Sequence, residues 1–312
     1  MKLVPPLAAV LACAVACGGA DGPARAASPP TPSAAGKSTA AVPRATAAPT
    51  AVPPARVVPP KVAPGVSARW VVYDRRTKKI LSQRSPKATI RSASVVKLLI
   101  AVDYLERHGG RVAAADARAF GLMLRSSDDK AATRFWNLGG KGKIITRMRK
   151  RIPLAQSAPP PAAQPGFWGY TAISALDIAK AYRYLEEKAT PATRKVVLGH
   201  LRTSTPCGTD GFDQSFGIPS AVKRPWAVKQ GWSGFGNTPP YACRATAQGA
   251  SFTPVAGPDL GLGRPVLHTT GVIGAGDRYI VVVLTLNPAG ASYRTSVQRI
   301  TKLAKGLTKG LA

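Results

Sequence analysis

A serine and a lysine three residues apart open an apolar segment of this chain. The stretch RSASVVKLLIAVDYLE, residues 91–106, places Ser94 ahead of Lys97 and continues with apolar residues at helical spacing. On a helix, side chains three positions apart lie on one face within reach of each other. A serine hydroxyl is a weak nucleophile that needs a neighbouring base and a site for the oxyanion. A neutral Lys97 amine could take the Ser94 proton, which indicates acyl-transfer chemistry; the alternative is a capped helix carrying a surface lysine.

The pair alone is a weak signal, because Ser127 and Lys130 have the same spacing. Two later segments add to it. The stretch RSSDDK offers the Ser127 hydroxyl, which could pass a proton to a leaving amine. The stretch VKQGWSG offers Lys229, a cation for a cleft, followed by Gly231, where a substrate backbone could approach closely. Together the three segments predict one site.

In this order, SVVK, SDD and KQG resemble the S-x-x-K, S-D-N and K-T-G motifs of the penicillin-recognising serine enzymes, the class A β-lactamases and penicillin-binding proteins. The resemblance spans residues 66–311. It implies that Ser94 is the acylated nucleophile and Lys97 its base or proton partner. It also implies that Ser127 relays a proton and that Lys229 binds a substrate carboxylate. No cofactor is implied.

The same resemblance assigns the remaining site residues. The oxyanion hole would be formed by the backbone N–H groups of Ser94 and Trp232. Contacts to the substrate would come from Asp129, Gln230, Gly231 and Trp232. The substrate class implied is a small molecule or peptide, either a β-lactam or a peptidoglycan-like amide.

Three departures from the family pattern weaken the expected turnover. Asp129 stands where the family has Asn, and a carboxylate near the base lysine favours the charged form of that lysine. Trp232 stands where small residues are usual and narrows the pocket. No Asp or Glu occurs between Asp129 and Asp177, and Gln156 and Gln164 cannot activate a water at neutral pH. A long-lived acyl-enzyme is therefore expected.

The pattern of apolar residues predicts an α+β fold of the β-lactamase type. Strands at both ends of the folded part would form one antiparallel sheet, packed by the last helix, with an all-helical lobe inserted between them. Strands are expected at 66–85 (a hairpin), 224–232, 267–274 and 278–287; helices are expected at 91–106, within 113–140 (two), and at 143–151, 174–187, 191–203 and 293–311.

The N-terminal segment resembles a secretory signal. Residues 1–17 hold a short apolar run that is too short to span a bilayer, and they end on AVAC before Gly18. This ending resembles a lipoprotein box with Cys17 as the lipidated residue, although Ala14-Val15-Ala16 also suits ordinary signal peptidase. Lipidation would anchor the protein to the outer face of the cytoplasmic membrane, whereas the alternative would secrete it. The Pro/Ala/Thr-rich residues 18–65 would form a disordered tether, and residues 66–312 the hydrolase domain.

Two cysteines remain in the exported chain. Cys207 and Cys243 are expected to form a disulfide, because such bonds persist outside the cytoplasm; two buried thiols are the alternative. With three His and no paired Cys spacing, no metal site is expected.

The chain has a formal charge of +30. Its Lys and Arg residues are scattered and not striped with aromatic residues, so no nucleic-acid partner is expected. An anionic membrane surface or anionic wall polymers fit the charge better, and a solvated surface with no specific partner is the alternative. A monomer is expected.

The sequence thus predicts an exported serine hydrolase or acyl-transferase whose Ser94 attacks a lactam or a peptide amide. The alternative is a catalytically degenerate envelope lipoprotein with a binding or scaffold role, which Asp129, Trp232 and the carboxylate-free loop favour.

Overall fold

A computed structural model describes residues 57–240, 243 and 263–311. The predicted signal segment, with the predicted lipidation residue Cys17, and residues 18–56 of the predicted tether lie outside these residues. None of the described helices is both long enough and apolar enough to cross a bilayer.

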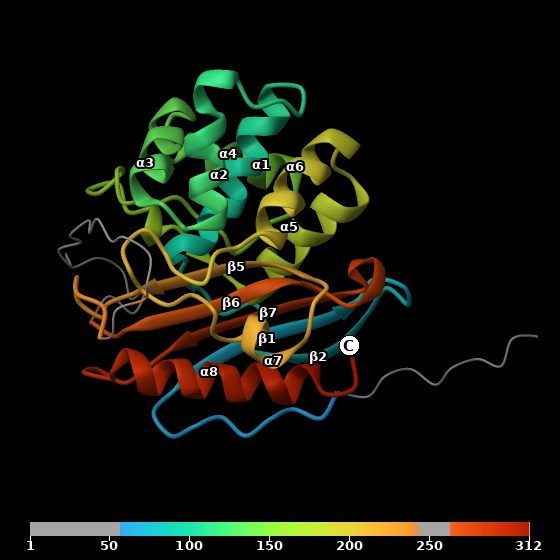
Figure 1. Ribbon diagram of the computed structural model, residues 1–312, viewed down its shortest axis with the longest axis vertical. Coiled ribbons are helices and arrows are strands. Elements are labelled where there is room, and N and C mark those ends of the chain that lie inside the picture. The colour runs from blue at the N-terminus through green and yellow to red at the C-terminus, as the bar shows by residue number, and fades with distance from the viewer. Residues whose placement is uncertain (1–56, 241–242, 244–262, 312) are drawn as a thin grey trace, which may run out of the picture. The chain divides into compact units, whose positions relative to one another are not determined.

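Within the described residues, a five-stranded sheet has the order β2-β1-β7-β6-β5, and each neighbouring pair is antiparallel (Figure 1). The strands are β1 (Ser67–Asp74), β2 (Lys79–Arg84), β5 (Trp226–Ser233), β6 (Val266–Ile273) and β7 (Tyr279–Leu286), and a small second sheet pairs β3 (Ile90–Arg91) with β4 (Ala172–Ile173). The first two strands of the large sheet come from the beginning of the domain and the other three from its end, which confirms the predicted sheet.

Helices cover both faces of the large sheet (Figure 1). On one face lie the lobe helices and short 3-10 turns: η1 (Ala93–Val96), α1 (Lys97–Arg107), η2 (Ala114–Asp116), α2 (Ala117–Arg125), α3 (Asp129–Leu138), α4 (Lys143–Arg151), η3 (Trp168–Tyr170), α5 (Ala175–Glu187) and α6 (Pro191–Arg202). On the other face lie α7 (Ile218–Ala221) and α8 (Tyr293–Thr308), and η4 (Ala275–Asp277) joins β6 to β7. The α+β fold with an inserted helical lobe is therefore confirmed.

The central strand β7 shows why both faces are covered. Its sequence YIVVVLTL is apolar at almost every position, and side chains alternate between the two faces of a strand. Ile280, Val282 and Leu284 belong to the core shared with the helical lobe, whereas Val281 and Val283 belong to the core shared with α8. Helix α8 presents a buried stripe to this second core, as its sequence predicts.

Two helix starts differ in their caps. Ser174 caps α5, because its Oγ accepts a hydrogen bond of 3.1 Å from Asp177 N. The segment predicted as a helix over 91–106 begins with the 3-10 turn η1, and Ser92 before it makes no side-chain cap. Ser94 lies in this turn.

The end of the predicted tether packs on the domain. Residues 57–65 belong to the described part of the chain, and Val57 is buried in the core that includes α8. Val62 is partly buried against the same core. The packed part of the chain therefore begins before residue 66.

Candidate active site

The predicted nucleophile Ser94 lies in η1 and is 5 % exposed. The residue before it, Ala93, has a φ of 43°, which is uncommon for a residue other than glycine. Such backbone strain persists only where the surrounding structure holds it, and it clusters at functional sites. The strained turn is therefore a second sign, beside the S-x-x-K spacing, that this segment has a function.

The predicted base Lys97 is fully buried at the start of α1. Its Nζ donates to Ser94 Oγ at 2.9 Å and to Asp129 Oδ1 at 2.6 Å. It also donates to the backbone oxygen of Ser127. The Asp129 carboxylate thus forms an ion pair with the predicted base lysine.

Ser127 lies between the two predicted amines. Its Oγ accepts from Lys229 Nζ at 2.9 Å and lies 3.3 Å from Lys97 Nζ. Its own φ is 56°, a second strained position in the site. The following residue, Asp128, caps α3 by accepting from Ala131 N at 2.7 Å, which fixes the turn that carries Ser127. Three segments that are distant in the sequence therefore converge on one hydroxyl.

Lys229 is buried, whereas the sequence predicted a cation facing a cleft. It lies on β5, is 1 % exposed, and donates to Ser127 Oγ and to the backbone oxygen of Gln230. Burial, and after it the charge of Lys97, lowers the pKa of Lys229 well below its usual value.

Strand β5 passes close to η1 at Gly231. A Cβ at this position would lie 3.1 Å from Val95 Cγ2 and 3.2 Å from both Ser92 O and Val95 N. The sequence suggested that this glycine admits a substrate; its nearest neighbour is instead the segment that carries the nucleophile. Neighbouring Gln230 is 1 % exposed, and its amide donates to backbone oxygens of the loop between α6 and β5. Neither residue lines the pocket beside Ser94.

That pocket has a volume of about 310 Å³ and contains Ser94 in its wall. Besides polar and small residues, it is lined by the aromatic residues Trp168, Tyr170, Phe212, Trp232 and Phe235 and by the charged residues Arg91, Asp129 and Asp210. The volume is at the small end of the range for ligand sites. Trp232 lines it, as predicted from its position after K-x-G.

Asp210 is the site residue that sequence reasoning missed. It comes from the loop between α6 and β5, where no motif relates it to Ser94. Its Oδ2 accepts from Trp232 Nε1 at 2.8 Å and its Oδ1 accepts from Phe212 N at 3.1 Å. Burial raises the pKa of Asp210, while these two hydrogen bonds oppose the shift. The pocket thus has two carboxylates, Asp129 and Asp210.

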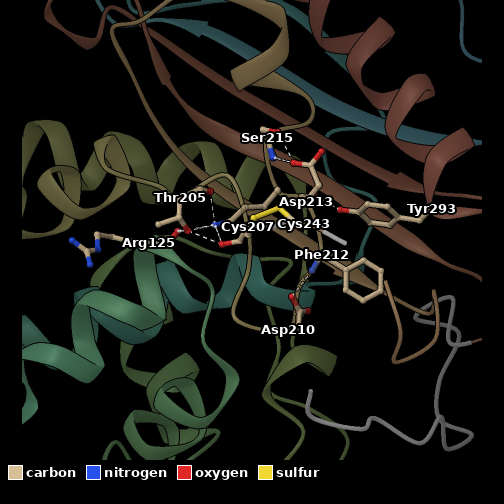
Figure 2. Close-up of a disulfide and its surroundings, with 10 residues drawn as sticks. Arg125, Thr205, Cys207, Asp210, Phe212, Asp213, Ser215, Cys243 and Tyr293 are labelled. Carbon is tan, nitrogen blue, oxygen red and sulfur yellow. Dashed lines mark hydrogen bonds between the residues drawn. A yellow bond between two sulfur atoms is a disulfide. The ribbon is translucent and has the colours of Figure 1, made fainter. Parts of the chain in front are cut away.

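The predicted disulfide between Cys207 and Cys243 is present, with the Cα atoms 5.7 Å apart (Figure 2). Cys207 lies three residues before Asp210, in the loop that forms one wall of the pocket. This loop is also held to the end of α2, because Gln214 Nε2 donates to Arg125 O at 2.7 Å. The wall that carries Asp210 is therefore covalently fixed to the chain that follows β5.

An aromatic ring occupies the space beside Lys97. The Trp168 ring centre lies 4.6 Å from Lys97 Nζ, and the Trp168 indole donates to Thr133 Oγ1 at 3.2 Å. The segment between α4 and α5, which holds Trp168, has no Asp or Glu. Among the described residues, no group of three or more His, Cys, Asp or Glu side chains is placed to hold a metal ion.

The fold has close counterparts among solved structures. PBP-A superimposes with a TM-score of 0.57 at 14 % identity, covering 79 % of this chain and 90 % of PBP-A. The β-lactamase of Sphaerobacter thermophilus gives 0.56 at 15 % identity, covering 78 % and 91 %. The class A β-lactamase of Mycobacterium abscessus gives 0.55 at 14 % identity, covering 78 % and 94 %. The chain has the β-lactamase-like fold, and the resemblance is confirmed at that level.

Sequence comparison gives relatives that carry a name but no activity. The protein called "Putative lipoprotein LppW" in Mycobacterium tuberculosis and in Mycobacterium bovis is 36 % identical over 233 residues. The match covers 72 % of this chain and 65 % of the length of these relatives. No family model matches the chain.

Proposed function

We propose that this protein is a serine hydrolase or acyl-transferase of the β-lactamase and penicillin-binding type, with Ser94 as the nucleophile. One observation carries the proposal: the hydroxyls of Ser94 and Ser127 are hydrogen-bonded to the buried amines of Lys97 and Lys229, and Ser94 lines a pocket. The fold supports it, because its solved counterparts include β-lactamases.

In the proposed reaction, Ser94 Oγ forms a bond to the carbonyl carbon of a lactam or peptide amide while its proton passes to a neutral Lys97 amine. The oxyanion is held by the backbone N–H groups of Ser94 and Trp232. The C–N bond then breaks as the Ser127 hydroxyl gives a proton to the leaving nitrogen and takes one from Lys97. The product is an acyl-enzyme and a free amine, with both lysines in their starting states.

Deacylation in this proposal is slow. Water attack on the ester needs a general base, and the segment between α4 and α5 supplies none. The residue that this segment places beside Lys97 is Trp168, which cannot act as a base. Asp129 is engaged by Lys97, and Asp210 by Trp232 and Phe212. The acyl-enzyme should therefore accumulate.

A second candidate function is binding without turnover. It is favoured by the 2.6 Å contact between Asp129 and Lys97, which engages the predicted base in an ion pair. The burial of Lys229 adds to this, because it removes the expected cation from the pocket wall. In this case the protein would hold a ligand at the envelope and acylate nothing.

The proposed location is the outer face of the cytoplasmic membrane, with Cys17 lipidated. The name of the mycobacterial relatives supports export as a lipoprotein. We propose a monomer. Its residues 1–17 hold the signal and the lipidation site Cys17, and the tether and the hydrolase domain follow. The charge of +30 suits an anionic membrane surface or wall polymer as a surrounding partner.

The test is covalent labelling of the mature protein and of Ser94→Ala with a fluorescent penicillin and with a fluorescent activated ester. A band that depends on Ser94 and decays over many minutes is the expected result. Labelling of both proteins alike, or of neither, would favour the binding function. Rapid hydrolysis of a chromogenic cephalosporin would contradict the slow deacylation.

A further inference from the structure

The charged groups at the pocket surface are unusual for a site that should bind a substrate carboxylate. Lys97 and Lys229 are 0 % and 1 % exposed, and neither lines the pocket. Two carboxylates, Asp129 and Asp210, do line it. The third charged residue there, Arg91, is 1 % exposed and donates to the backbone oxygen of Arg264 at 2.6 Å.

Asp210 lacks a cationic partner. Among the residues that the structure describes, no Lys, Arg or His nitrogen lies within 4.0 Å of its carboxylate. Within the described part of the chain, its oxygens accept hydrogen bonds from two neutral donors, Trp232 Nε1 and Phe212 N. A carboxylate has about four acceptor positions, so capacity remains for a further donor. Burial raises the pKa of Asp210 and the Asp129 charge adds to the rise, while the two hydrogen bonds and the Lys97 charge oppose it; a bound cation would oppose it further.

Two aromatic residues contact this carboxylate, and others line the same pocket. Phe212 and Trp232 both line the pocket, and their ring centres lie 6.3 Å apart. The Phe212 backbone N–H and the Trp232 indole N–H each donate a hydrogen bond to Asp210. Phe235 and Tyr170 also belong to the wall. The faces of such rings attract ammonium and guanidinium groups, most strongly where water is excluded. A carboxylate among aromatic rings is the chemistry that recognises an organic cation.

We propose that Asp210 and its aromatic neighbours form a subsite for a cationic group, an ammonium or quaternary ammonium, on the acyl substrate of Ser94. The substrate class is thus an amine-bearing ester or amide. A substrate with a free carboxylate at the same position would bind less well, because Asp210 repels it. The proposal uses the site described under the proposed function and adds the identity of its ligand. Asp210 acts in binding and takes no part in bond formation.

The geometry of the wall supports a preformed subsite. The Cys207–Cys243 disulfide and the bond from Gln214 to Arg125 O hold the loop that carries Asp210 (Figure 2). A Cβ on Gly208 would lie 2.8 Å from Trp232 Cζ2, so the ring packs directly against this loop. A preformed subsite binds its ligand without the cost of ordering the loop.

The experiment compares two nitrophenyl esters that differ only in charge. One acyl chain ends in a trimethylammonium group and the other in a tert-butyl group of the same shape. The measured quantity is the second-order rate of nitrophenolate release that depends on Ser94. The expected result is a preference of at least about tenfold for the cationic ester, lost in Asp210→Asn. Asp213→Asn, on the same loop but absent from the pocket wall, should keep the preference.

A second arm needs no turnover. Binding of hydrolysis-resistant amides of the same two acyl chains to Ser94→Ala is measured by calorimetry. Tighter binding of the cationic amide, lost on Asp210→Asn in the Ser94→Ala background, supports the subsite even if no ester is cleaved. Equal binding of the two amides would overturn it. Trp232→Phe keeps the carboxylate and should retain part of the preference, which separates a loss of charge from a collapse of the wall.

The two proposals fail in different ways. If neither ester acylates Ser94 but the cationic amide binds better, the proposed acyl transfer is wrong and the cation subsite stands. If both esters acylate Ser94 at equal rates in the wild type, acyl transfer stands and the subsite is wrong. A preference for the neutral ester would also overturn the subsite.

Discussion

The Asp129 carboxylate is the single residue that most affects the predicted base. It lies 2.6 Å from Lys97 Nζ and forms an ion pair with this lysine. We expect Asp129→Asn to raise the rate of Ser94 acylation by about tenfold, because an amide removes the charge and can donate to a substrate. The measurement is the second-order rate of labelling with a fluorescent activated ester.

Asp128→Asn is the matched control for this change. Asp128 is the adjacent carboxylate, and it caps α3 by accepting from Ala131 N, a role that Asn also performs. Its labelling rate should stay near that of the wild type. A fall in rate for Asp129→Asn would show that the carboxylate assists the reaction, and would contradict the inhibitory role argued from the geometry.

At the scale of residues, the sequence predicted the groups that short spacings define. Ser94, Lys97, Ser127 and Lys229 could be selected because each lies in a short motif, and the fold brings their side chains together. Asp210 could not be predicted, because its place beside Ser94 depends on how a loop between a helix and a strand folds back. The lowered pKa of Lys229 could not be predicted either, since it depends on the burial of that side chain.

At the scale of elements, the site depends on the approach of β5 to η1. Gly231 lies at this approach, where an added Cβ would lie 3.2 Å from Ser92 O and Val95 N. These are backbone atoms, which cannot move aside as a flexible side chain can. We expect Gly231→Ala to push β5 away from Ser94 and to lower the acylation rate on the order of 100-fold, because catalytic groups tolerate little displacement.

Gly199→Ala tests whether the effect is local. Gly199 lies in α6, and an added Cβ there meets no atom within 4 Å. This substitution should leave the acylation rate unchanged and should not lower the thermal midpoint, since Ala favours helix. If Gly231→Ala labels as fast as the wild type while remaining folded, the approach of β5 to η1 is not needed for the reaction.

The elements themselves were largely predictable because apolar periodicity fixes them. The strand β7 is a continuous apolar run and the helix α8 shows a clear helical period. The 3-10 turn η1 was not predictable, because the bend at Ala93 follows from contacts with distant segments and not from local propensity. The packing of residues 57–65 was also missed, since this Pro-rich stretch has few large apolar residues and Val57 gains its burial from α8.

At the scale of the whole molecule, a charged cluster joins the helical lobe to the turns of the sheet. Glu186, at the end of α5, lies 3.3 Å from Arg75 in the turn between β1 and β2. Asp277, in the turn between β6 and β7, forms an ion pair with Arg202 of α6. Burial raises the pKa of Glu186 to about 7; Arg75 opposes this shift, and the Asp277 carboxylate adds to it.

This shift makes stability depend on pH with a definite sign. Between the ordinary value of 4.5 and about 7, Glu186 holds a proton in the folded protein and has lost it in the unfolded chain. The unfolded chain therefore binds fewer protons, and the free energy of unfolding falls as pH rises through this range. The free energy of unfolding falls by up to about 3 kcal/mol through the Glu186 contribution, and the fall is complete above pH 7. Buried His268, with its pKa lowered to about 4, has the opposite effect below pH 6.5.

Because these two groups oppose each other, the prediction is made for a difference between proteins. Glu186→Gln keeps the shape of the side chain but cannot ionise. We expect its free energy of unfolding, relative to the wild type, to increase as pH rises from about 4.5 to 7 and then to level off, while the His268 contribution cancels. Urea unfolding over this range measures the difference.

Glu187→Gln is the control. Glu187 is adjacent to Glu186 and is paired with Arg183 at the surface, so this variant should show no such rise. A constant difference for Glu186→Gln across the range would mean that Glu186 is ionised at pH 5 and that Arg75 outweighs both burial and Asp277 in this cluster.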